Sequence, residues 1–192
     1  MKKNILSFPV LPGIVFIWLT AMVLLPYDAY GQVNADSSSK PYSWFSAGIG
    51  GGSSGYSLGT GFSGQISNSG IFSVRLIYNT KLDFWATPSE SVLDFSLLYG
   101  YLAVIPEGFV TLSGGLSLVN GVKQGESIPS DGWLGKKYEK LSFTSVGFPL
   151  EGNIFWKFSP SIGLGITLFA DINAEKSFYG IFFCLKYGHL TD

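Results

Sequence analysis

Histidine and cysteine, which supply general bases, nucleophilic thiols and zinc ligands, are scarce in this chain: each occurs once among its 192 residues. His189 lies near the last residue and has no serine partner in a recognisable motif, so no pairing of a nucleophile with a base is indicated. Cys184 has no second cysteine with which to form an intramolecular disulfide. One histidine and one cysteine are also too few for a typical zinc site. We therefore expect no catalytic residue, no cofactor, no metal ion and no enzyme activity.

A few charged residues lie within the apolar segments, and they suggest a structural role. The negative charges are Asp94, Glu151 and Asp171, and the positive charges are Arg75, Lys81, Lys157 and Lys186. An unpaired charge is unfavourable when it is removed from water. We therefore expect Arg75 and Lys186 to neutralise the three carboxylates in one polar network that fills and stiffens a protein interior. A proton or ion path is the alternative function for the same residues.

The overall composition excludes several classes of protein. Hydrophobic residues make up 46% of the chain and charged residues only 13%, so the chain is not intrinsically disordered. Its 12 basic and 13 acidic residues give a net charge of −1, which leaves no basic surface for a nucleic acid. The length suits a single folded domain.

The N-terminal segment has the features of a secretory signal peptide. Lys2 and Lys3 precede an apolar stretch over residues 5–25, and the small residues Ala29 and Gly31 follow it. This order of charged, apolar and small residues predicts export and cleavage after Gly31. An uncleaved anchor helix is the alternative, because an apolar stretch of about 20 residues is long enough to span a membrane.

After a polar linker at residues 32–40, the apolar residues recur at every second position. Phe72, Val74 and Leu76, for example, alternate with Ser73 and Arg75. This period of two is typical of β-strands with one apolar face. The expected strands are residues 42–50, 54–64, 70–82, 90–105, 108–119, 140–158, 160–173 and 177–189.

The number and length of these strands predict the fold class. Most of them reach the roughly 9 to 11 residues that a tilted strand needs to cross a membrane. An open sheet edge in lipid would leave backbone polar groups without partners, so the strands must form a closed ring. Residues 41–192 are therefore expected to form an all-β, eight-stranded antiparallel up-and-down transmembrane β-barrel.

The alternative is a secreted, lipocalin-like barrel, which would turn its apolar face inward. The presumed polar face is rich in glycine, which suits a narrow interior, and the strands carry too few charges for a surface in water. We therefore place the apolar face in lipid. Aromatic residues near the strand ends would lie at the two membrane interfaces. They include Trp44, Tyr78, Tyr99, Tyr101, Trp156, Tyr179 and Tyr187.

The connections between strands predict which end faces outward. In membrane barrels the periplasmic turns are short and the extracellular loops are longer. The second, fourth and sixth connections are short, whereas the third is longer and the fifth, from Asn120 to Glu139, holds about twenty residues. The first and seventh connections, which would also face outward, are short as well. This loop is expected on the cell surface, where it would be a candidate contact site for an unknown ligand.

The pattern of signal peptide, eight alternating strands and glycine-rich interior resembles the small outer-membrane β-barrels of Gram-negative bacteria, the OmpX-like and OmpA-transmembrane-like group. The stretches at residues 147–153 and 177–180 resemble the final strands of uncharacterised barrels from Bacteroidetes. The resemblance implies an outer-membrane location, contact with outer-membrane lipid and with the barrel-assembly machinery, and a structural or surface-contact role. A barrel that modifies lipids or handles small solutes is the alternative.

This group usually ends in an aromatic residue that serves as an assembly signal. The present chain departs from that pattern, because it ends in Gly188, His189, Leu190, Thr191 and Asp192. We expect either Tyr187 or Leu190 to take the place of the terminal aromatic residue.

Overall fold

The computed structural model describes residues 41–192, except for residues 54, 82–85, 88, 129–135 and 191–192. The expected signal peptide at residues 1–31 and the linker at residues 32–40 lie outside the described residues. Cleavage after Gly31 therefore remains a prediction. In the described part of the chain, no helix has the length and apolar character needed to cross a membrane.

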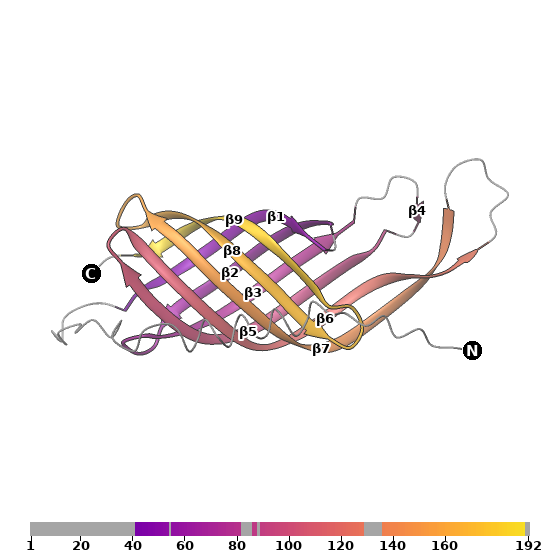
Figure 1. Ribbon diagram of the computed structural model, residues 1–192, viewed down its shortest axis with the longest axis horizontal. Helices are drawn as coiled ribbons and strands as arrows, with labels where there is room; N and C mark the ends of the chain where they lie inside the picture. The colour runs from indigo at the N-terminus through magenta and orange to yellow at the C-terminus, as the bar shows by residue number, and fades with distance from the viewer. Residues whose placement is uncertain (1–40, 54, 82–85, 88, 129–135, 191–192) are drawn as a thin grey trace. The chain divides into compact units, whose positions relative to one another are not determined.

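Eight antiparallel strands form a closed ring, in which each strand pairs with its neighbour in sequence (Figure 1). The last pairing, between β8 and β9, and the pairing of β9 with β1 complete the ring. The predicted fold class is thus confirmed. The strands of the ring are β1 (Ser43–Gly52), β2 (Gly55–Gln65), β3 (Gly70–Thr80), β5 (Ser91–Ile105), β6 (Gly108–Ile128), β7 (Lys136–Lys157), β8 (Ile162–Asn173) and β9 (Phe178–His189).

We call the end of the barrel where β1 begins and β9 ends the terminal end, and the opposite end the hairpin end. Short turns join β2 to β3, β5 to β6 and β7 to β8 at the terminal end. At the hairpin end, β1 turns into β2 through Gly55, whose φ of 96° is a conformation that only glycine adopts without strain. The two-residue strand β4 (Ala86–Thr87) pairs in parallel with the start of β7.

The β6–β7 hairpin is longer than the sequence pattern indicates. β6 continues to Ile128 and β7 begins at Lys136, and the two strands stay paired from Asn120↔Thr144 to Ile128↔Lys137 with one irregularity after Gln124. The prediction of a twenty-residue loop from Asn120 to Glu139 is therefore wrong, because most of these residues belong to β6 and β7. Its glycines and proline are typical of a loop, but each strand finds a ready antiparallel partner in the other. In Figure 1 the hairpin extends beyond the other strands of the ring.

The apolar face of the barrel points outward, as predicted. Large apolar side chains are exposed on every strand of the ring, while alternate polar side chains are buried inside. On β3, for example, Leu76 is exposed and Arg75 is buried. On the outward row, the run of exposed large apolar side chains ends at Leu118 on β6 and at Val146 on β7. The next outward residues, Asn120 and Thr144, are polar and bond to each other at 3.2 Å. The hairpin thus extends past the apolar belt.

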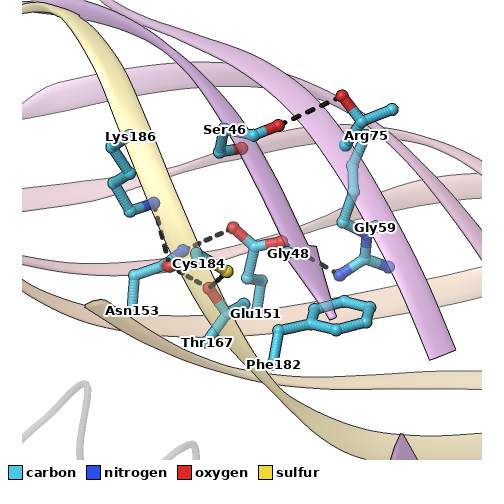
Figure 2. A pocket seen from close by; sticks show the side chains of 11 residues that line it. Ser46, Gly48, Gly59, Arg75, Glu151, Asn153, Thr167, Phe182, Cys184 and Lys186 are labelled. Atoms are coloured by element: carbon cyan, nitrogen blue, oxygen red, sulfur yellow. Dashed lines mark hydrogen bonds and ion pairs between the residues drawn. The ribbon is translucent and has the colours of Figure 1, made fainter. Parts of the chain in front are cut away.

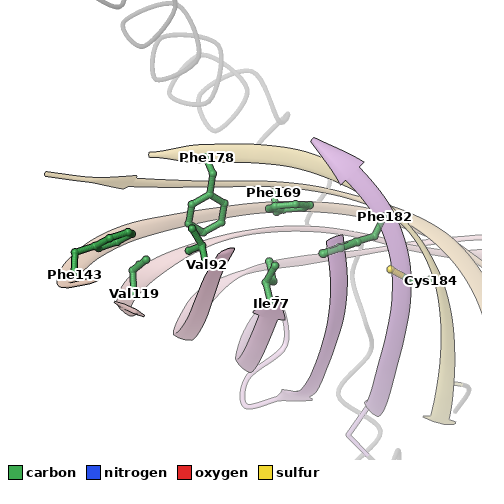
Figure 3. Packing of buried hydrophobic residues seen from close by; sticks show 8 residues of the cluster. All are labelled: Ile77, Val92, Val119, Phe143, Phe169, Phe178, Phe182 and Cys184. Carbon is green, nitrogen blue, oxygen red and sulfur yellow. The ribbon is translucent and has the colours of Figure 1, made fainter. Parts of the chain in front are cut away.

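The interior contains two apolar clusters, which alternation alone did not predict. The terminal cluster consists of Tyr42, Trp44, Ile71, Leu102, Phe109, Phe155 and Leu190. The hairpin-end cluster, shown in Figure 3, consists of Ile77, Val92, Val119, Phe143, Phe169, Phe178, Phe182 and Cys184. They lie toward the two ends of the lumen, with polar side chains between them.

The assignment of Trp44 to a membrane interface is wrong. Its side chain is only 1% exposed and lies inside the terminal cluster, with its ring stacked 6.0 Å from that of Phe109. Trp44 and Phe45 are adjacent aromatic residues, so the sequence did not reveal which of them faces inward. Strand pairing decides it, and Phe45 is the exposed one.

Candidate functional site in the barrel lumen

Arg75 of β3 lies at the centre of the polar layer between the two apolar clusters. Its Nη2 atom donates to Oδ2 of Asp94 at 3.0 Å and to Oγ of Ser96 at 3.2 Å. Its Nη1 atom donates to Oε2 of Glu151 at 3.1 Å. Glu151 belongs to β7, which is three strands away from β3 around the ring. The guanidinium therefore bridges the lumen and compensates two buried carboxylates.

Lys186 of β9 is linked to this group through an amide. Its Nζ atom donates to Oδ1 of Asn153 at 3.1 Å, and Nδ2 of Asn153 donates to Oε1 of Glu151 at 2.6 Å. Lys186 also lies over the rings of Phe155 and Trp44, with its Nζ atom 4.9 and 5.6 Å from the ring centroids. None of the ion pairs between described residues includes Lys186. The expected direct pairing of Lys186 with a carboxylate is therefore replaced by an amide and two aromatic faces.

Asp171 of β8 has neutral hydrogen-bond partners, and the ion pairs of Arg75 among the described residues do not include it. The hydroxyl of Ser117 donates to its Oδ2 atom, and Nδ2 of Asn173 donates to Oδ1 at 2.8 Å. A Cβ atom on Gly147 would lie only 2.3 Å from Oδ1 of Asp171 and 2.5 Å from the Ser117 hydroxyl. Asp171 and Ser117 can thus meet across β7 because residue 147 has no side chain. The structure brings four of the five expected residues into one linked group, and Asp171 forms a second.

Neutral residues that the sequence did not single out complete these contacts. Asn153 lies two residues after Glu151 and Ser96 two residues after Asp94, so alternation places each beside its carboxylate inside the barrel. The hydroxyl of Thr167 donates to Asn153 and contacts the sulfur of Cys184 at 3.2 Å. Period-two spacing from the known charges was the signal that could have identified the first two.

A small cavity lies against this group, and Figure 2 shows the side chains around it. Arg75, Glu151, Asn153, Cys184 and Lys186 are among the residues that line it. Its volume of about 20 Å³ is enough for roughly one water molecule. Pockets for small organic ligands are larger by an order of magnitude, at about 300 to 1,000 Å³. The cavity is therefore suited to hydrating the buried charges rather than to holding an organic substrate.

His189 and Cys184 do not form a joint site. They are five residues apart on β9, so strand alternation places them on opposite faces. Within the described part of the chain, no group of three or more His, Cys, Asp and Glu side chains is arranged to hold a metal ion.

Comparisons with known proteins find the fold but no sequence family. No family model and no curated protein matches the chain. The N-terminal β-barrel domain of Pseudomonas aeruginosa OprF is similar, with a TM-score of 0.51 and 11% identity over 77% of this chain and 98% of that one. Neisserial surface protein A (NspA) has a TM-score of 0.54 and 16% identity over 78% of this chain and 97% of that one.

These matches and the closed ring define the class of structure: the chain has the fold of the small eight-stranded outer-membrane β-barrels. At such low identity the likeness concerns the fold alone. The narrower resemblance to barrels from Bacteroidetes remains a prediction.

Proposed function

We propose that this chain is an integral, non-enzymatic protein of the outer membrane of a Gram-negative bacterium, with a structural or surface-contact role. The observation that carries the proposal is the belt of exposed apolar side chains around all eight strands of the ring. Such a belt is unfavourable in water and favourable in lipid. The similarity in fold to the OprF barrel domain and to NspA supports the same environment.

A closed lumen supports a structural role over transport. The two apolar clusters and the Arg75 network occupy successive levels of the interior, and the cavity beside Arg75 has room for about one water molecule. Eight-stranded barrels generally have interiors that side chains fill. Solute passage would therefore require several layers of side chains to move.

The β6–β7 hairpin is the proposed contact surface. It continues beyond the apolar belt with polar outward residues such as Asn120 and Thr144. With the short turns on the periplasmic side, this hairpin lies outside the cell. The described residues of the expected loop, 120–128 and 136–139, would then meet a surface ligand along the projecting strands.

Tyr187 is our proposed assembly signal for the barrel-assembly machinery. Its side chain is 64% exposed on the outer face of β9, whereas Leu190 is fully buried in the terminal cluster. An outward aromatic residue on the last strand is accessible to another protein before the ring closes. Tyr187 also stays accessible once the strands have paired, whereas Leu190 is enclosed as the terminal cluster forms.

Membrane fractionation followed by gel electrophoresis tests the outer-membrane proposal. The full chain should be recovered with the outer membrane and should migrate differently in cold SDS before and after boiling, because a closed barrel resists the detergent until it is heated. Recovery as a soluble periplasmic monomer without detergent would overturn the proposal and favour a lipocalin-like barrel.

A further inference from the structure

The connection between β8 and β9, at residues 174–177, is a compact unit built around one side chain. The backbone N–H groups of Glu175 and Lys176 both donate to Oδ1 of Asn173, at 3.1 and 2.7 Å. Nδ2 of Asn173 donates back to the carbonyl of Lys176 at 3.0 Å. These three bonds all lie within residues 173–176, so they fix the local shape of the connection.

Two ion pairs fasten this connection to other strands at the hairpin end. Nζ of Lys176 lies 2.9 Å from Oε2 of Glu90, which directly precedes β5. Oε2 of Glu175 lies 2.7 Å from Nζ of Lys123 on β6. Since β5 is three strands from β8 around the ring, these contacts cross the mouth of the lumen. All four side chains are partly exposed, so water and salt compete for both pairs.

The hairpin-end cluster lies directly below. Phe178, which follows the connection, is buried against Phe169 with a ring separation of 6.3 Å, and Phe169 stacks on Phe182 at 4.4 Å. Lys123 links the two levels, because its Nζ atom also lies 5.8 Å from the ring centroid of Phe143. Cys184 lies beyond Phe182 (Figure 3), and it lines the small cavity together with Arg75.

We propose that residues 174–177 act as a strap over the hairpin-end mouth of the lumen, held shut by the Lys176–Glu90 and Glu175–Lys123 ion pairs. Release of the strap admits water and small polar solutes to the top of the hairpin-end cluster. It does not open the barrel from end to end, because the Arg75 network and the terminal cluster remain in place. The strap concerns access to the lumen and does not depend on the proposed outer-membrane location.

Thiol labelling at two depths tests the strap. Val92 is buried in the hairpin-end cluster two residues from Glu90, so a Val92→Cys, Cys184→Ser protein carries its single thiol just below the strap. The unaltered chain carries its only thiol deeper, at Cys184. Each protein is refolded in detergent and labelled with a small, water-soluble methanethiosulfonate, with and without the paired substitutions Glu90→Gln and Glu175→Gln.

Removal of both ion pairs should accelerate labelling of the Val92→Cys thiol by about tenfold and leave labelling of Cys184 within about twofold of its original rate. Glu107→Gln is the matched control, because Glu107 is an exposed carboxylate in the β5–β6 turn at the terminal end. It should change neither rate. In a further variant, Glu90→Gln is replaced by the exchanged pair Glu90→Lys and Lys176→Glu, and Glu175→Gln is kept. The exchanged ion pair should restore most of the protection of the Val92→Cys thiol against labelling.

Two results would overturn the proposal. If the Val92→Cys thiol stays fully protected after both carboxylates are neutralised, the ion pairs do not hold the mouth shut. If Cys184 becomes reactive to the same extent, the whole barrel has loosened and residues 174–177 are not a separate strap. In both cases the outer-membrane proposal stands or falls separately, by its own fractionation test.

Discussion

Arg75 is the described side chain that pairs with the largest number of buried carboxylates. It contacts Asp94 and Glu151, and its replacement would leave both carboxylates in the lumen without their cation. We predict that Arg75→Met lowers the free energy of unfolding by about 3 to 5 kcal/mol. Urea titration of the refolded barrel measures this. Lys140→Met, at an exposed position on the hairpin, is the control and should change stability by less than about 0.5 kcal/mol.

Gly59 illustrates why glycine is needed inside the barrel. A Cβ atom there would lie 2.7 Å from the ring of Phe182, which cannot shift easily because it is buried and stacked on Phe169. We predict that Gly59→Ala destabilises the barrel by about 1 to 3 kcal/mol and that adding Phe182→Leu recovers part of the loss. Gly64→Ala on the same strand should be nearly neutral, since the nearest atom to its Cβ is 3.8 Å away. Equal effects at the two glycines would contradict this account.

At the residue scale, the sequence revealed which side chains carry the lumen charge but not how they pair. The acidic and basic residues were recognisable because charges are rare within apolar strands. Their partners depend on how the ring brings distant strands together, so the Asn153 contact of Lys186 and the Ser117 contact of Asp171 could not be foreseen. Neutral polar residues also gave no signal of their own in a serine-rich chain.

The strands themselves were predictable where one face is apolar and the other polar. Six of the eight expected strands agree with the structure to within two residues at each end. The β6–β7 hairpin failed this test because it leaves the apolar belt, and outside lipid neither face needs to be apolar. The extra length of this hairpin depends on pairing between β6 and β7, and the residue pattern of either strand alone does not indicate such pairing.

Glu90 gives the strap a defined dependence on pH. Partial burial raises the pKa of Glu90, but the hydrogen bond and charge of Lys176, the N–H of Gln124 and the charge of Lys81 together outweigh it and hold the pKa below the ordinary value of 4.5. When folding lowers the pKa of a carboxyl group, the folded state is stabilised at every pH above the ordinary pKa of that group. This stabilisation is lost as the pH falls from the ordinary pKa through the lowered pKa.

We therefore predict that the difference in free energy of unfolding between the unaltered chain and Glu90→Gln is constant at neutral and mildly acidic pH. This difference should shrink only when the pH falls below 4.5, the ordinary pKa of a glutamate side chain. Urea titrations at a series of pH values measure it, with Glu126→Gln, an exposed carboxylate on β6, as the control. A difference that already disappears near neutral pH would show that Glu90 has no such stabilising partners.

At the scale of the whole molecule, the order of apolar and polar layers from the outside of the barrel inward indicates whether the barrel lies in lipid or in water. An apolar exterior surrounds the two apolar clusters and the charged centre of the lumen. A barrel that binds an apolar ligand in water has the reverse arrangement, with a polar exterior. Eight strands are enough to close the ring and to satisfy the backbone, and the interior is then too narrow for more than side chains. The apolar exterior and the closed ring thus both follow from one alternating pattern, whereas the apolar clusters inside the lumen do not.

The most direct test of the membrane-barrel account places the same charge at two depths on the outer face. Leu168 lies midway along β8 and is 57% exposed, and Ser142 lies on the outward row of β7 beyond the apolar belt. Leu168→Arg should cost about 2 to 4 kcal/mol in refolding into lipid vesicles, and Ser142→Arg about 0 to 1 kcal/mol. Equal stabilities of the two variants, or an unaltered chain that folds and stays monomeric in water without detergent, would contradict the account.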